Sequence, residues 1–186
     1  MKTLVCFLEE PSAREMLNGI LPRLLPEGIV CKYIVFEGKQ DLEKQLVRKM
    51  RSWLAPDSVF LVMRDQDTAD CMDVKDRLST LCLEAGRPEA LIRIACHELE
   101  SFYFGDLNAV EKGLGVKNLA SRQRKAKYRV PDAIVNPCSE LEKLTEGAYQ
   151  HVKGSRSIAP HLSLENNTSH SFNVLIDGIR ALYSCT

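Results

Sequence analysis

Two aspartates separated by one residue follow an apolar run in the first half of the chain. Val59-Phe60-Leu61-Val62-Met63 is uninterrupted by polar residues and leads through Arg64 into Asp65-Gln66-Asp67. Side chains at i and i+2 of a strand point the same way, so Asp65 and Asp67 are expected side by side. Adjacent carboxylates repel each other unless protons or a cation neutralise them, and their hard oxygens suit Mg²⁺ or Mn²⁺. The pair therefore predicts a divalent-metal site.

Further acidic residues follow two other apolar runs. Glu9-Glu10 come after residues 3–8, and Glu98 and Glu100 come after residues 91–96. The carboxyl ends of parallel strands lie on one rim of a sheet, so these groups can meet at one or two metal ions. Metal-assisted phosphoryl chemistry uses such a cage, with ions about 3.5–4 Å apart.

Acidic residues at these places also cap helices or favour their first turns. Capping explains Glu9 or Glu10 as well as a ligand role does, but it needs only one carboxylate and so explains the Asp65 and Asp67 pair less well. A helical turn would separate Glu98 and Glu100 by roughly 200°. Only one of these two can then face the site.

The elements that must position these acids alternate along the chain. Strands are expected at residues 3–8, 29–36, 59–63 and 91–96, and helices at 11–25, from about 39 to before Pro56, and at 69–85. This alternation predicts a doubly wound, mainly parallel α/β sheet. A last helix at about 172–182, with Ser169 and Ser171 as candidate caps, is expected to dock back on the core.

Composition sets limits on the function. The 186 residues are 45% hydrophobic and 27% charged with a net charge of zero, as in an ordinary globular protein. Contact with nucleic acid must therefore rest on local basic patches and on metal. The residue pattern of the sequence changes near residue 107. This change predicts an α/β core at 1–107 and a basic, mostly helical or loop extension at 108–186 that packs back on the core.

Seven cysteines, without a Cys-x-x-Cys pair, are expected to be reduced thiols, with no disulfide framework and no zinc site. The sequence has no signal peptide and no apolar span of about 18 residues. A cytoplasmic location without membrane contact is therefore expected.

An apolar strand ending in Glu9, followed later by an apolar strand ending in Asp65-Gln66-Asp67, resembles the Toprim fold of topoisomerases, primases and overcoming-lysogenisation-defect nucleases. More closely, the chain resembles a Toprim-related bacterial family of unknown function that is often found beside AAA/ABC-type ATPases in phage-defence loci. The most specific matching segments are Arg64-Asp65-Gln66-Asp67 and Glu98-Leu99-Glu100; others are Leu8-Glu9-Glu10-Pro11-Ser12, Glu37-Gly38-Lys39, Pro131-Asp132, Asn136-Pro137, Ile158-Ala159-Pro160-His161 and Ser169-His170-Ser171-Phe172.

This resemblance implies a Toprim-like (Rossmann-like) sheet with a mostly helical C-terminal extension. It also implies that Glu9 acts as general acid/base or metal ligand and that Asp65 and Asp67 hold Mg²⁺ or Mn²⁺. Either Glu98 or Glu100 would complete the cage, and Glu100 is favoured. Toprim proteins usually have glycine after the first glutamate, and here Glu10 takes that place, so the register of Glu9 against Glu10 stays open.

Basic residues can support phosphate chemistry. Lys39, Lys75, Lys153 and Arg156 are candidates to neutralise a phosphate, although solvated side chains explain Lys39 and Lys75 better. A basic segment can track a nucleic-acid backbone or form a solvated loop; its candidate contacts are Arg122, Arg124, Lys125, Lys127 and Arg129.

Three functions fit these residues. The first is a Mg²⁺- or Mn²⁺-dependent nuclease acting on DNA or RNA, tRNA included, as the effector of an ATPase-gated anti-phage defence system. The second is an interaction module with little activity that docks on a partner ATPase and regulates it. The third is a phosphatase, because Asp65-Gln66-Asp67-Thr68 matches the Asp-x-Asp-x-Thr motif of haloacid-dehalogenase-like enzymes. That motif belongs on a first strand, whereas here the third strand precedes it.

Overall fold

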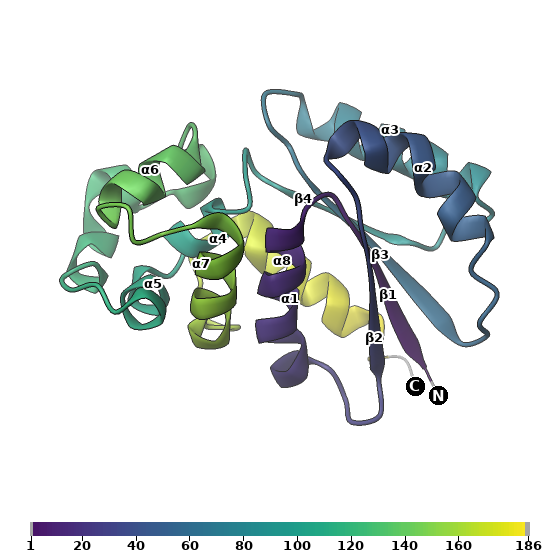
Figure 1. The fold of residues 1–186 in the computed structure, drawn as a ribbon, viewed down its shortest axis with the longest axis horizontal. Coiled ribbons are helices and arrows are strands. Elements are labelled where there is room, and N and C mark those ends of the chain that lie inside the picture. The colour runs from purple at the N-terminus through teal and green to yellow at the C-terminus, as the bar shows by residue number, and fades with distance from the viewer. Residues whose placement is uncertain (1, 185–186) are drawn as a thin grey trace.

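A parallel four-stranded sheet forms the centre of the computed structural model, which describes residues 2–184 (Figure 1). The strand order is β2-β1-β3-β4, with bounds Thr3–Leu8 for β1, Val30–Val35 for β2, Ser58–Asp65 for β3 and Leu91–Ala95 for β4. The central strands β1 and β3 are covered on both faces, and this explains their nearly unbroken apolar runs.

Helices cover both faces of the sheet (Figure 1). On one face, α2 (Lys39–Arg51) and α3 (Cys71–Glu84) pack over alternate residues of the central strands, such as Phe7 and Val62. On the other face, α1 (Pro11–Leu24) and α8 (His170–Ala181) cover the remaining ones, such as Leu8 and Met63. The predicted α/β class with a parallel sheet is confirmed.

The chain between β4 and α8 is a run of short helices on the α1 side of the sheet. Its elements are α4 (Ser101–Phe104), α5 (Leu107–Leu114), the 3₁₀ turns η1 (Ala120–Arg124), η2 (Ala126–Tyr128) and η3 (Pro131–Ala133), then α6 (Pro137–Leu144), α7 (His151–Ile158) and η4 (Ala159–His161). Helix α7 packs along α1, and the apolar core beneath α1 continues without a break into this part of the chain.

Side-chain caps set the starts of three helices, among them α5, where Asp106 accepts a hydrogen bond from the backbone N–H of Ala109. Asp70 accepts hydrogen bonds from the backbone N–H groups of Met72 and Asp73, so α3 begins at Cys71. Ser169 accepts one from Phe172, so α8 begins at His170, two residues before the expected start. Capping of this kind satisfies N–H groups that have no partner within the helix.

Six cysteines of the described residues are free thiols; Cys185 lies outside that range. Within residues 2–184, the helices are all too short or too polar to cross a membrane.

Candidate metal centre

Glu9 and Asp65 meet at the carboxyl edge of the two central strands. Strands β1 and β3 pair in parallel with Leu8 opposite Met63. Glu9, directly after β1, is therefore level with Arg64, one residue before Asp65 at the end of β3. The backbone N–H of Asp65 donates a hydrogen bond to Glu9 Oε2 at 3.0 Å. The next strand, β4, ends opposite Asp65 at Ala95, and the turn after it brings the Leu99 N–H to the Asp65 carboxylate.

Three carboxylates, those of Glu9, Glu10 and Glu100, lie close enough to Asp65 at this edge to raise its pKa. Burial raises the pKa of Asp65 well above its usual value, and the negative charges of Glu10, Glu100 and Glu9 raise it further. Burial also raises the pKa of Glu9 and of Glu100, and Glu10 adds to both effects. A divalent cation offsets such repulsion, and carboxylate oxygens are the ligands that Mg²⁺ and Mn²⁺ prefer. The donor type therefore suits a hard cation. Among residues 2–184, however, no three of these four carboxylates offer oxygens within 4.8 Å of one another, so the side chains would have to close in to share an ion.

Arg64 forms ion pairs with three acids around the end of β3, which are Glu9, Glu43 and Asp67. Its side chain is only 5% exposed, and Nη1 lies 2.8 Å from Glu43 Oε1 while Nε lies 3.8 Å from Glu9 Oε2. Nε also donates to the carbonyl oxygen of Asp65 at 2.9 Å. Arg64 and Glu43 were not among the sequence candidates. The sequence did contain a signal for this pairing, because Arg64 lies in a buried strand next to acids and a buried charge requires a partner.

Asp67 lies beyond the end of β3, and its carboxylate is already paired. Its Oδ2 is 2.7 Å from Lys39 Nζ and 3.5 Å from Arg64 Nη2. Asp67 has φ of 56°, and its N–H donates to the carbonyl oxygen of His97 at 2.7 Å. Because β3 ends at Asp65, the strand rule for i and i+2 does not reach Asp67. The sequence expectation placed both aspartates on one strand; the turn separates their environments.

Glu98 and Glu100 have different partners. Glu98 Oε2 accepts a hydrogen bond at 2.7 Å from the backbone N–H of Cys138, in the first turn of α6. Glu100 is 2% exposed and is one of the three carboxylates whose charges raise the pKa of Asp65. The hydroxyl of Tyr149 donates to Glu100 Oε1 at 2.6 Å, which favours the carboxylate form.

Glu10 stands at the cap position of α1 and receives a hydrogen bond from the hydroxyl of Ser12. Among the neighbouring acids, Glu10 has the largest effect on the pKa of Asp65. Glu9 and Glu10 therefore both lie near Asp65. The structure does not decide which of the two corresponds to the Toprim glutamate, the question that the sequence left open.

The comparisons with known proteins support this fold. A family model described as "Domain of unknown function (DUF4276)" matches residues 8–180. The chain belongs to this family. A solved structure, the C-terminal region of the Burkholderia pseudomallei OLD protein, is similar with a TM-score of 0.54 and 17% identity, over 96% of this chain and 97% of that one. No curated protein matches the sequence. The structural likeness confirms the Toprim-like fold of this family member.

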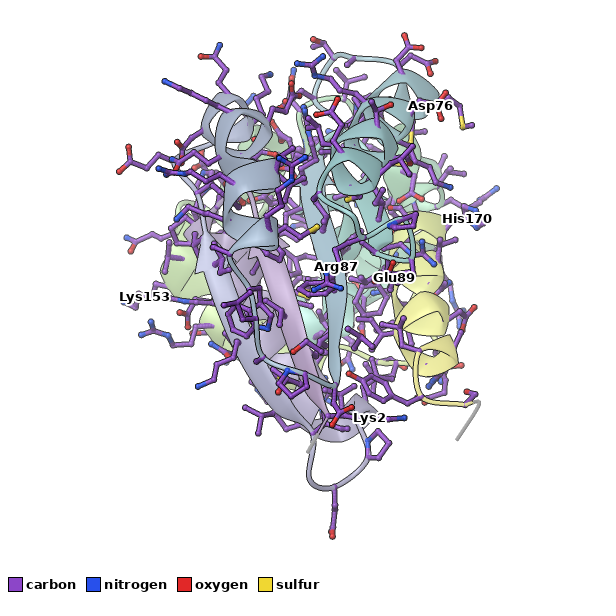
Figure 2. All side chains as sticks on the ribbon, turned by 90° about the vertical axis from the view of Figure 1, so that its right-hand side faces the viewer. Lys2, Asp76, Arg87, Glu89, Lys153 and His170 are labelled. Atoms are coloured by element: carbon purple, nitrogen blue, oxygen red, sulfur yellow. The ribbon has the colours of Figure 1, made fainter. Side chains whose placement is uncertain are left out.

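The other basic candidates lie in different surroundings. Lys75 is exposed on α3 and, with Arg93 and Cys96, lines a cavity of about 160 Å³ between α3, β4 and α8. Arg156 on α7 pairs with Glu15 of α1 at 2.6 Å. Lys153 is exposed and points outward on the side away from α8 (Figure 2). Of the four phosphate-neutralising candidates, only Lys39 contacts a candidate acid.

The basic segment forms the turns η1 and η2. Four of its five candidates are exposed and Arg122 is half-buried, while Lys127 pairs with Glu140 at 2.5 Å. Tyr128, the aromatic residue of this segment, is buried and stacks on Phe104 with ring centroids 5.4 Å apart. Its ring is therefore not available to stack on a base. Contact between this segment and nucleic acid would rest on the positive charges of its side chains.

Proposed function

We propose that this DUF4276 member is a Mg²⁺- or Mn²⁺-dependent nuclease that cuts phosphodiester bonds in DNA or RNA. The observation that carries the proposal is the placement of Glu9, Glu10 and Glu100 around the buried Asp65, whose pKa their charges raise, at the carboxyl edge of a Toprim-like sheet. Ligands of open α/β sheets bind at this edge.

The residues divide the chemistry among them. Asp65 and Glu100, with Glu9 or Glu10, would hold the ion, which supplies an activated water and stabilises charge on the scissile phosphate. Burial raises the pKa of Glu9 above its usual value, and a raised pKa suits a carboxylate that acts as general acid or base. Arg64 fixes the backbone of Asp65 and lies beside Glu9.

Two features can guide a phosphate backbone to the edge. Lys39 is half-exposed and held beside the site by Asp67, so its charge can meet a phosphate. The exposed basic side chains of residues 122–129 add a local positive surface to a chain of zero net charge. In this proposal, residues 1–107 carry the catalytic group and residues 108–186 contribute nucleic-acid contacts.

The biological role follows from the family resemblance. We propose that the protein acts in the cytoplasm as the effector of an ATPase-gated anti-phage defence system, with an AAA/ABC-type ATPase as its partner. The interaction-module alternative draws on one observation: Asp67, a residue of the most specific segment, is already paired with Lys39 and Arg64. Under that alternative the acidic edge would be a structural feature of a docking scaffold.

A cleavage assay separates the two functions. Purified protein, alone and with the neighbouring ATPase, is incubated with plasmid DNA and total tRNA in Mg²⁺ or Mn²⁺. Asp65→Asn is compared with Asp76→Asn, a matched change on the outer side of α3 (Figure 2). The nuclease proposal expects cleavage by the wild type and Asp76→Asn, and none by Asp65→Asn, which still binds the ATPase. Absence of wild-type cleavage under all these conditions would favour the docking module.

A further inference from the structure

A cysteine and a histidine lie against the side of Glu100. Cys138 Sγ is 2.9 Å from His151 Nε2, and His151 Nδ1 is 3.9 Å from Glu100 Oε1. One donor atom from each of the three residues lies within 4.8 Å of the other two. They come from the first turn of α6, the start of α7 and the turn before α4, so nothing in their spacing along the sequence points to a shared site.

We propose that Glu100, Cys138 and His151 bind a transition-metal ion, with Zn²⁺ the best match. A thiolate, an imidazole and a carboxylate are the three side-chain types that Zn²⁺ takes in proteins, and three protein ligands leave a fourth position for water or substrate. Mg²⁺ has little affinity for sulphur or imidazole, so this site, although it shares Glu100 with the carboxylates around Asp65, differs from them in the ion it selects.

Surrounding contacts hold the three ligands in place. Tyr149 donates to Glu100 at 2.6 Å, and Tyr149 is itself 2% exposed and packed against Tyr103 with ring centroids 6.0 Å apart. The hydrogen bond from the Cys138 N–H to Glu98 fixes the start of α6. Partners of this kind orient metal ligands and are a regular part of metal sites.

The charge around the three residues favours a cation. Among the ion pairs of residues 2–184, Glu100 has His151 as a partner but no lysine or arginine. A further carboxylate, Glu142, lies 3.9 Å from Cys138 Sγ. The site therefore combines a buried carboxylate with nearby acids and without a fixed positive charge, and a bound ion would supply that charge.

The same three residue types also form the catalytic triads of cysteine hydrolases. That role requires a thiolate stabilised by positive surroundings. Here the groups around Cys138 are acidic: Glu142 lies 3.9 Å from its Sγ, Glu98 accepts the hydrogen bond of its N–H, and Glu100 lies 3.9 Å from the neighbouring His151. An acidic environment disfavours a free thiolate nucleophile, whereas a metal ion stabilises a bound one, so the metal site is the better interpretation.

Cobalt titration of the full chain tests this proposal. Co²⁺ bound by a thiolate gives a charge-transfer absorption band in the near ultraviolet, so Co²⁺ alone is the probe. We expect the band in the wild type and in Cys71→Ser, a half-buried cysteine of α3, and its loss in Cys138→Ser. His151 is half-exposed, so a second variant at this position leaves the core packing in place: His151→Asn should weaken Co²⁺ binding by at least about tenfold. Zn²⁺ should displace Co²⁺, and excess Mg²⁺ should not.

The outcomes are independent of nuclease activity. A band that persists in Cys138→Ser, or a wild type without any band, overturns the site. Asp65→Asn should keep the band, because Asp65 is not one of the three ligands. A protein that shows the band and cleaves nothing would refute the nuclease proposal and leave this one standing.

Discussion

Asp65→Asn should stabilise the metal-free protein at neutral pH. The folded pKa of Asp65 is raised, so the folded state holds the proton more tightly than the unfolded state, whose pKa is about 3.9. The folded state therefore loses stability as the pH rises from the pKa of the unfolded state towards the pKa of the folded state. This stability is not regained at higher pH. Asparagine has nearly the same shape and carries no charge, so the variant escapes this loss and can still accept the N–H of Leu99.

The size of the effect follows from the linkage. Each unit by which the pKa is raised corresponds to about 1.4 kcal/mol. For a protein of 186 residues, 1 kcal/mol shifts Tm by about 2–4 °C, so each unit should raise the Tm of the variant by about 3–6 °C. An ion at about 100 times its Kd adds about 2.7 kcal/mol to the free energy of unfolding, which is equivalent to a rise in Tm of about 5–11 °C. The ion should raise the Tm of the wild type far more than that of the variant.

Thermal melts at pH 4, 7 and 8, in EDTA and in Mn²⁺, measure both effects. The wild type should lose Tm from pH 4 to pH 7 relative to Asp65→Asn, and Mn²⁺ should reverse the order of the two proteins. Asp76→Asn serves as control and should follow the wild type throughout. If Asp65→Asn melts below the wild type in EDTA at pH 7, and Mn²⁺ raises both Tm values equally, the carboxylate-repulsion argument is refuted.

Two further substitutions test the supporting contacts. Glu98→Ala removes the acceptor for the Cys138 N–H at the start of α6 and should lower the free energy of unfolding by about 1 kcal/mol in urea, while the Mn²⁺-induced shift is retained; an unchanged free energy would show that this bond contributes nothing. Tyr149→Phe removes a hydrogen bond to the buried Glu100 and should cost about 1.5–3 kcal/mol at pH 8. The cost of Tyr149→Phe should be smaller at pH 4, where Glu100 is protonated, and an equal cost at both pH values would contradict the assigned role.

The sheet could be predicted from the sequence because burial on both faces dictates its composition. The strands expected at 3–8 and 59–63 are observed as Thr3–Leu8 and Ser58–Asp65. A side chain between two layers of helices must be apolar whichever way it points, so local composition reveals such strands. The short turns η1 to η3 lack this regularity, and they could be expected only as loops or short helices.

The acidic edge was predictable for the same topological reason, since the carboxyl ends of parallel strands share one rim. The contacts that each acid makes could not be predicted from the sequence. Asp67 enters a left-handed turn after β3, and Glu98 binds the first turn of α6, forty residues further along the chain. Such contacts depend on tertiary packing, which no spacing in the sequence encodes, and Cys138 with His151 is another example.

The most direct test of the central claim is to locate the ion itself. A crystal of the protein soaked in Mn²⁺ gives an anomalous difference map that marks manganese. We expect a peak between Asp65, Glu100 and one of Glu9 or Glu10, with ligand oxygens about 2.0–2.6 Å away. A map without a peak at Asp65, whether it is empty or shows manganese only beside Cys138 and His151, would contradict the claim that these carboxylates form a divalent-metal centre.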